Sequence, residues 1–220
     1  MSTAASPHRK RRVLPVLVVA VAAASWLALT ASAPAAVTSG CTGASATPAE
    51  ASPDAIAQAT VCLLNQERSR YGLSPLRLNA RLAQAALAHS RDMVEQRYFS
   101  HTTPSGATFG DRIRAAGYLH GAPAWMLGEN IGWGTLQLST PEEAVSAWMH
   151  SPGHRANILS SSFRDIGAGV AVGVPDDLSG PAATYTTDFG VKVITQPSSR
   201  AGRAAGRPRR HRTPRRRRLP

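Results

Sequence analysis

Two histidines and a glutamate stand in segments of the chain that can present a polar side chain to a cleft. His101 ends the segment Tyr-Phe-Ser-His, Glu129 lies in Gly-Glu-Asn-Ile-Gly-Trp, and His154 follows Ser-Pro-Gly. Neutral imidazole nitrogens are good ligands for zinc, copper or nickel, and a carboxylate can complete such a site or orient one of the rings. We therefore predict that His101, Glu129 and His154 form an open site for a divalent metal, with zinc as the expected ion.

The segment WMHSPGHRANIL is predicted to hold His154 in a fixed direction. Pro152 cannot continue a helix and Gly153 adopts backbone angles that other residues avoid, so one helix should end there and another begin. Apolar residues after the corner can anchor it in the core, as a side chain in a site requires. We expect Ser151 and Asn130 to border the same cavity.

Other chemistries are open to the same residues. A metal-bound water with Glu129 as its base would make the protein a hydrolase of extracellular peptides, polysaccharides or lipids. Ser100, Ser105 and Ser151 lie near the histidines in sequence, but none sits in the sharp glycine-flanked turn of a serine esterase. A polar cavity that only shapes the fold is a further alternative. We therefore assign no catalytic residue.

A third histidine, His89, lies on the apolar face of a predicted helix. A lone histidine in that setting is more often a hydrogen-bonded core residue than a ligand. We therefore expect His89 in the core and leave it out of the metal site.

Five motifs in this order resemble the CAP superfamily, the cysteine-rich secretory, antigen 5 and pathogenesis-related proteins that share the SCP domain. The motifs are FSH, GENI with GWG, WMHSPGHRANIL, IGAGVAV and YTTDFG. The match is to the short bacterial branch of the family and covers roughly residues 56–193. Several motifs in register are far more specific than any one of them alone.

The resemblance implies an α–β–α sandwich and a cavity with two histidines and two acids. His101, Glu129 and His154 carry over onto that set, whereas Ser151 stands where many eukaryotic members have the second acid. This departure favours binding over a mechanism that needs all four residues. The resemblance also implies a third alternative, a module that carries a lipid or sterol.

The pattern of apolar residues, caps and breakers predicts an α+β domain with a small antiparallel sheet flanked by helices. Asp54 is expected to cap the first helix, Asn79 the second and Thr140, followed by a proline, a later one. The glycines of IGAGVAV should let a strand pack closely against a helix. The predicted helices span 54–71, 79–96, 109–116 and a segment from 140, and the predicted strands span 126–134, 166–174 and 182–193.

The two ends of the chain have compositions unlike the middle. A basic stretch, an apolar run and Ala33-Pro-Ala35 predict a signal peptide over residues 1–35, cleaved near Ala35 rather than kept as a membrane anchor. Small and polar residues predict a flexible linker over 36–53, before the domain at 54–195. Residues 196–220 hold ten arginines and four prolines and are predicted to be a disordered tail.

Cys41 and Cys62 both lie in the part that we expect to be exported. An even pair of cysteines in an oxidising compartment predicts a disulfide, with two free thiols as the alternative. The bond would tie the N-terminal segment to the first helix.

The net charge of +12 belongs to the ends of the chain. Between them stand eleven basic and thirteen acidic residues, a net charge of −2, which argues against a specific nucleic-acid-binding fold. The arginine-rich tail is expected to bind anionic cell-wall polymer or lipid headgroups, with a solvated tail that has no partner as the alternative. Together, the sequence predicts a secreted, monomeric binding module of the cell envelope or its surroundings, with no transmembrane segment after cleavage.

Overall fold

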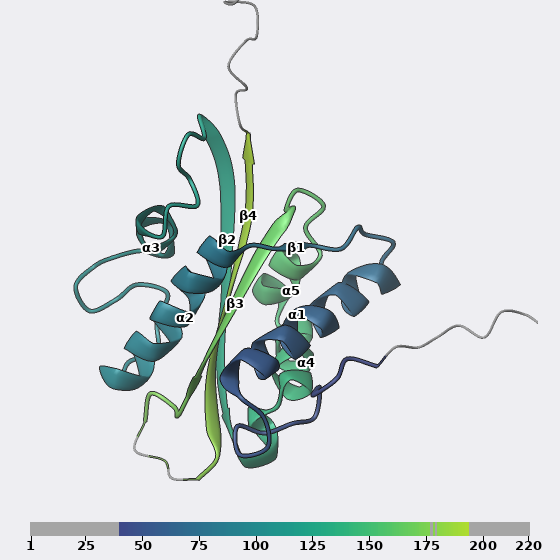
Figure 1. The fold of residues 1–220 in the computed structure, drawn as a ribbon, viewed down its shortest axis with the longest axis vertical. Coiled ribbons are helices and arrows are strands. Elements are labelled where there is room, and N and C mark those ends of the chain that lie inside the picture. Colours follow the sequence, from purple (N-terminus) through teal and green to yellow (C-terminus); the bar gives the residue numbers. More distant parts are fainter. Residues whose placement is uncertain (1–39, 177, 179, 194–220) are drawn as a thin grey trace, which may run out of the picture. The chain divides into compact units, whose positions relative to one another are not determined.

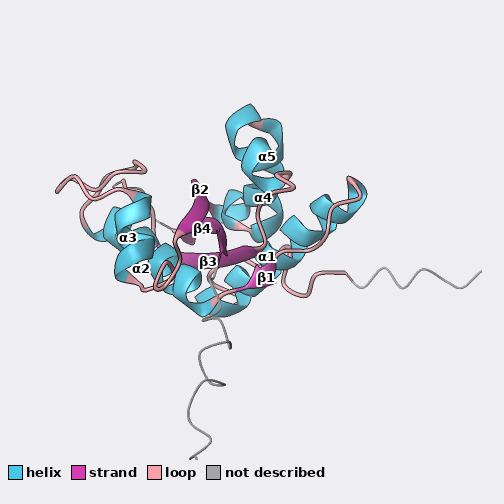
Figure 2. Ribbon diagram, turned by 90° about the horizontal axis from the view of Figure 1, so that it is seen from above, coloured by secondary structure: helices cyan, strands magenta, loops and turns pink. Residues whose placement is uncertain are grey.

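A small twisted sheet lies between two layers of helices in the computed structural model, which describes residues 40–176, 178 and 180–193 (Figures 1 and 2). The elements are α1 (Pro53–Arg70), β1 (Arg77–Leu78), α2 (Ala80–Glu95), α3 (Phe109–Ala115), β2 (Ala124–Thr135), the 3-10 helix η1 (Leu136–Ser139), α4 (Pro141–His150), α5 (Pro152–Ile158), β3 (Asp165–Val172) and β4 (Ala182–Val193). The predicted α–β–α sandwich is therefore confirmed.

The sheet has the order β1-β3-β4-β2, so that the long strand β2 lies at an edge. β4 is antiparallel to both of its neighbours, whereas the two-residue β1 pairs with β3 in parallel. Sequence alone suggested only an extended link at β1. In the register of β2 and β4, Glu129 stands opposite Asp188 and Asn130 stands opposite Thr187. Because side chains alternate along a strand, these two pairs lie on opposite faces of the sheet.

The two faces of the sheet are covered by different helices (Figure 2). The larger core lies on the side of α1, α4 and α5, where Trp148 of α4 and Tyr185 and Phe189 of β4 are buried together. A smaller core beneath α2 and α3 contains Leu82 and Tyr118. The edge strand β2 is therefore reached by helices from both faces.

Helix α2 packs with its backbone against two glycines of β3. A Cβ atom built on Gly167 would lie 2.0 Å from the backbone nitrogen of Ala83, and one on Gly169 would lie 2.0 Å from that of Leu87. These distances are far inside van der Waals contact. The close helix–strand packing predicted from the IGAGVAV motif is confirmed, and it fixes the height of α2 above the sheet.

The helix starts agree with the predicted caps at two of three positions. The side chains of Asn79 and Thr140 accept hydrogen bonds from the first backbone amides of α2 and α4. The prediction for α1 was wrong, because Ser52 is the N-cap and Asp54 lies inside the first turn. Pro53 explains the difference, since proline has no amide hydrogen and suits the first position of a helix. Asp54 instead places a negative charge near the helix N-terminus.

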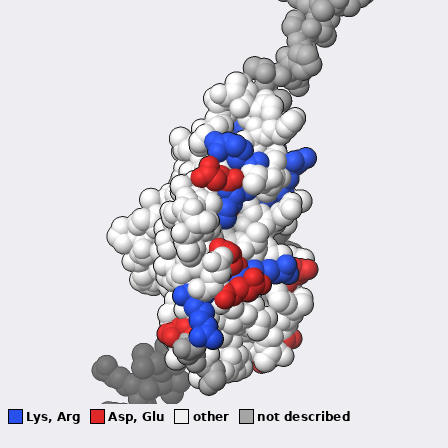
Figure 3. All heavy atoms as spheres, turned by 90° about the vertical axis from the view of Figure 1, so that its left-hand side faces the viewer, with Lys and Arg blue, Asp and Glu red and all other residues white. Residues whose placement is uncertain are grey.

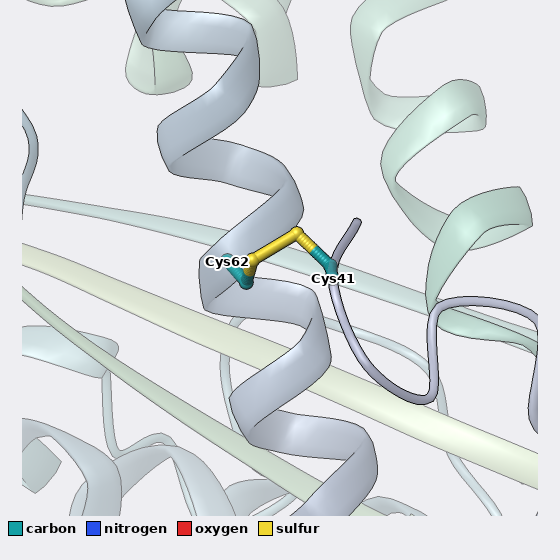
Figure 4. Close-up of a disulfide and its surroundings, with 2 residues drawn as sticks. All are labelled: Cys41 and Cys62. Carbon is teal, nitrogen blue, oxygen red and sulfur yellow. A yellow bond between two sulfur atoms is a disulfide. The ribbon is translucent and has the colours of Figure 1, made fainter. Parts of the chain in front are cut away.

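Residues 40–52 form turns that pack on the domain, which corrects the described part of the predicted 36–53 linker. Cys41 is buried and forms a disulfide with Cys62 in the middle of α1, as predicted, with an S–S distance of 2.02 Å (Figure 4). Thr47 is also buried and donates hydrogen bonds to the Glu50 carboxylate from its amide and its hydroxyl. A covalent bond and satisfied turns give this segment a fixed place despite its polar composition.

The predicted signal peptide over 1–35 and the predicted tail over 196–220 lie outside the described residues. In the part of the chain that the structure describes, no helix combines the length and apolar character needed to cross a membrane.

We predict that Gly169→Ala lowers the free energy of unfolding by about 3 kcal/mol, because its Cβ would meet backbone atoms that cannot rotate away. Urea unfolding followed by circular dichroism measures the change. Gly153→Ala is the matched control, since no heavy atom lies within 4 Å of its added Cβ and alanine favours a helix. Equal stabilities of the two variants would contradict the proposed role of the close packing.

Candidate functional site

The carboxylate of Glu129 joins two residues from other parts of the chain. Its side chain is only 1% exposed. One oxygen, Oε1, lies 2.7 Å from Nδ1 of His101, and the other, Oε2, accepts a hydrogen bond of 2.6 Å from Nη2 of Arg112. Both oxygens of the carboxylate are therefore engaged, one by an imidazole and one by a guanidinium.

His101 lies on the loop between α2 and α3, with its side chain 49% exposed. Because Nδ1 faces the carboxylate of Glu129, Nε2 is the ring nitrogen that remains available to a ligand. A carboxylate on one imidazole nitrogen is the arrangement by which metal-binding histidines are commonly oriented. The prediction that His101 and Glu129 come together is consistent with this geometry, and it places Glu129 behind the ring.

Arg112 was missed by the sequence analysis. Besides its bond to Glu129, its Nη1 donates to the carbonyl oxygens of His101 at 3.1 Å and Ala107 at 3.2 Å. It therefore holds both the acid of the site and the loop that carries His101. Nothing in the sequence distinguishes it from Arg114, whose side chain on the same helix is 57% exposed and pairs with a neighbouring aspartate.

His154 lies in the first turn of α5. Three hydrogen bonds of asparagine side chains hold this helix against β2. Asn130 Nδ2 donates to the carbonyl oxygen of His154 at 3.1 Å. Asn157 Nδ2 donates to the backbone carbonyl of Glu129 at 3.1 Å and to Asn130 Oδ1 at 2.9 Å. Asn130, which was expected to border the cavity, therefore links the strand of Glu129 to the helix of His154.

The His154 imidazole favours its neutral form. Burial lowers the pKa of His154, and the nearby His101 lowers it further. The effect of His101 on the pKa of His154 is consistent with the two residues bordering the same site. Neutral imidazole is the form that binds metals. Among the described residues, no three His, Cys, Asp or Glu side chains are arranged to hold a metal ion, so His101, Glu129 and His154 do not form a three-ligand set.

A groove of about 420 Å³ opens beside His154 between β2 and α4. Trp148 lies at its base, 2% exposed, and its Nε1 donates to the carbonyl of Ile131 at 2.9 Å. Phe99 and Trp133 line the groove and are 46% and 42% exposed. Ser151, which was expected to border the cavity, also lines the groove. The groove therefore combines apolar rings with one imidazole.

The serines near the histidines have other partners. Ser100 Oγ accepts from the amide of Thr102 at 3.1 Å, and the hydroxyls of Ser105 and Thr103 are hydrogen bonded at 2.9 Å. Within the described residues, the hydroxyl of neither Ser100 nor Ser105 is hydrogen bonded to an imidazole, so these two hydroxyls form no Ser–His pair.

Asp188 is a second acid of the site that the sequence analysis missed. It stands opposite Glu129 in the sheet and is 1% exposed. Burial and the facing Glu129 raise the pKa of Asp188 well above its ordinary value. In the sequence, the only indication of a buried acid here is that Asp188 stands within a predicted strand, between a threonine and a phenylalanine. The family-derived expectation of a second acid pointed instead to position 151, where a serine stands.

The family model for the cysteine-rich secretory protein (CAP) family matches residues 61–179. This chain belongs to the CAP family. The match runs from α1 to the turn before β4 and contains His101, Glu129 and His154. The assignment made from the five motifs is therefore confirmed.

Two curated relatives of this CAP protein come from Bacillus subtilis strain 168. The uncharacterized protein YkwD is 40% identical over 56% of this chain and 45% of its own length. The uncharacterized membrane protein YlbC is 34% identical over 49% of this chain and 29% of its own. The chain thus spans less than half the length of either relative.

Two solved structures are similar to this chain. An extracellular protein containing a SCP domain from Bacillus anthracis strain Ames is 32% identical, with 63% of this chain and 43% of that chain covered and a TM-score of 0.49. An outer surface protein from Borrelia burgdorferi is 20% identical, with 60% of this chain and 90% of that chain covered and a TM-score of 0.50. At this identity the second likeness supports the fold alone.

We predict that Asp188→Asn stabilises the CAP domain relative to the natural chain increasingly as pH rises. An acid with a folded-state pKa above its unfolded value of 3.8 favours folding while protonated, and that contribution is lost as pH rises toward the raised value. Asparagine does not ionise, so the variant does not lose this contribution. Urea unfolding should therefore show that the free energy of unfolding of the variant exceeds that of the natural chain slightly at pH 4 and more at pH 7. Glu95→Gln, at an exposed position of α2, is the control, and parallel curves for Asp188→Asn and the natural chain would contradict the prediction.

Proposed function

We propose that this protein is a secreted bacterial CAP-domain binding module whose cavity holds a divalent cation, zinc in the first instance, through His101 and His154. The observation that carries the proposal is the bond of 2.7 Å between Glu129 and Nδ1 of His101. It leaves Nε2 of His101 for a ligand, while the lowered pKa keeps His154 neutral. Two imidazoles leave coordination positions open for water or a bound molecule.

The engagement of Glu129 favours binding over hydrolysis. In a metal-dependent hydrolase this carboxylate would serve as the base for a metal-bound water. Here His101 occupies one oxygen and Arg112 the other, at 2.7 and 2.6 Å. The residue is therefore better placed to orient a ring than to accept a proton from water.

A second candidate function is the binding of a lipid or sterol. The groove beside His154 supports it, because Phe99, Trp133 and Leu138 line about 420 Å³ and remain largely exposed. Concave sites lined by apolar rings with a few polar groups are typical of small-molecule binding. A polar cavity without a ligand is the alternative to both candidates.

Export and attachment complete the proposal. The signal-peptide pattern and the disulfide Cys41–Cys62 both suit an oxidising compartment outside the cytoplasm. Figure 3 shows basic and acidic side chains interspersed on the face of α2 and α3. The ten arginines over 200–220, outside the described residues, are therefore the proposed contact with anionic wall polymer or lipid headgroups.

We expect the folded protein to bind Zn²⁺ with modest affinity in calorimetric titration, since a closed four-ligand site would be needed for tight binding. His101→Ala and His154→Ala should each lower affinity at least about 100-fold, whereas Glu129→Gln should lower it about 10-fold if the carboxylate only orients the ring. Binding should also weaken as pH falls, with His154 gaining its proton only below the ordinary value of 6.5.

His120→Ala is the matched control for these titrations, because His120 is an exposed histidine outside the site. Unchanged Zn²⁺ affinity in both the His101 and His154 variants would eliminate the metal-binding proposal and leave a polar cavity.

Deleting residues 196–220 should reduce binding to anionic wall material and remove its sensitivity to salt, because the tail holds most of the excess positive charge. Co-sedimentation with wall preparations at low and high salt measures both effects. Thermal unfolding of the domain should stay nearly unchanged, and a large loss of stability would show that the tail contributes to the fold.

A further inference from the structure

The buried ring of His89 lies beside the loop that carries His101. His89 belongs to α2 and is 0% exposed, as expected of a core residue. Its Nε2 lies 3.0 Å from the carbonyl oxygen of Ser100. A carbonyl oxygen only accepts hydrogen bonds, so Nε2 carries the proton and donates it. The core histidine thus holds the backbone immediately before His101.

A second bond holds the next carbonyl of the same loop. Nη1 of Arg112 donates to the carbonyl oxygen of His101 at 3.1 Å. Two consecutive carbonyls, of Ser100 and His101, are therefore fixed from α2 and from α3. The His101 ring itself is held by Glu129. His89 therefore constrains the carbonyl of Ser100, Arg112 the carbonyl of His101, and Glu129 the ring of His101.

The other side of the His89 ring faces a tyrosine. The hydroxyl of Tyr98 lies 3.4 Å from Nδ1 of His89 and donates to the carboxylate of Asp92. The two rings are tilted, with centroids 6.1 Å apart. Burial lowers the pKa of His89, which keeps the ring neutral and leaves Nδ1 unprotonated while Nε2 donates. The ring is therefore held in one orientation and one tautomer.

Packing alone does not account for a histidine at this position. An apolar side chain would fill the space without the cost of burying polar atoms. The hydrogen bond from Nε2 of His89 to the Ser100 carbonyl offsets this cost and fixes the backbone just before His101.

We propose that His89 is a positioning residue for the ligand-binding imidazole of His101, acting through the Ser100 carbonyl. The inference rests on the proposed function of His101 as a metal ligand. It explains how a side chain that is 49% exposed on a loop keeps the geometry that an open site requires.

The test compares two substitutions at one buried position. His89→Phe keeps a ring but removes the donor, whereas His89→Gln places an amide NH₂ near the position of Nε2. Calorimetric titration with Zn²⁺ should show affinity about 10-fold lower for His89→Phe and close to that of the natural chain for His89→Gln. Amide hydrogen exchange without metal should be faster at residues 100–103 in His89→Phe alone.

Leu82→Ala is the matched control, since it removes a fully buried side chain of the same helix outside the His101 loop. It should lower stability while leaving loop exchange and Zn²⁺ affinity unchanged. Natural affinity and loop exchange in His89→Phe would overturn the inference. If the natural chain binds no Zn²⁺, the proposed metal function fails, and the exchange experiment still decides whether His89 holds the loop.

Discussion

The contact between the backbone of α2 and the glycines of β3 determines where the other parts of the site lie. Gly167 and Gly169 have no side chain, so the helix approaches to a distance that any Cβ atom would prevent. At this height, the hydroxyl of Ser90 of α2 donates to the carbonyl of Gly169 and is also hydrogen bonded to the hydroxyl of Thr186. His89, one residue earlier, then reaches the loop before His101. The geometry of a surface loop thus depends on a contact in the core.

Glu129 of the edge strand β2 contacts residues of both helical layers. The side chain of Glu129 binds His101 and Arg112, which belong to the α2–α3 side. Its backbone carbonyl accepts from Asn157 of α5, on the other side. Alternation of side chains sends Glu129 to one face and Asn130 to the other. An edge position allows residues of both helical layers to contact Glu129.

Charge in the site is balanced by a single guanidinium. Two carboxyl groups, of Glu129 and Asp188, face each other in the sheet, and both residues are buried. Arg112 donates to one carboxylate, while burial and Glu129 raise the pKa of Asp188. Close acids in a low-dielectric setting rarely ionise together, so one of them keeps its proton more readily. The raised pKa of Asp188 favours its protonated form, while the carboxylate of Glu129 contacts His101 and Arg112.

The sequence by itself determined the features that local patterns encode. Helix caps, breakers and apolar periodicity located most elements, the motifs identified the family, and the glycines of β3 predicted close packing. Only the tertiary structure decided which residues from distant segments meet. Arg112 resembles any surface arginine of a short helix, and Asp188 enters the site through strand register. Ser52 displaced Asp54 as the cap of α1, because Pro53 fixes the first helical position. Strand register and the partners of Arg112 depend on contacts between segments far apart in sequence, which no local pattern records.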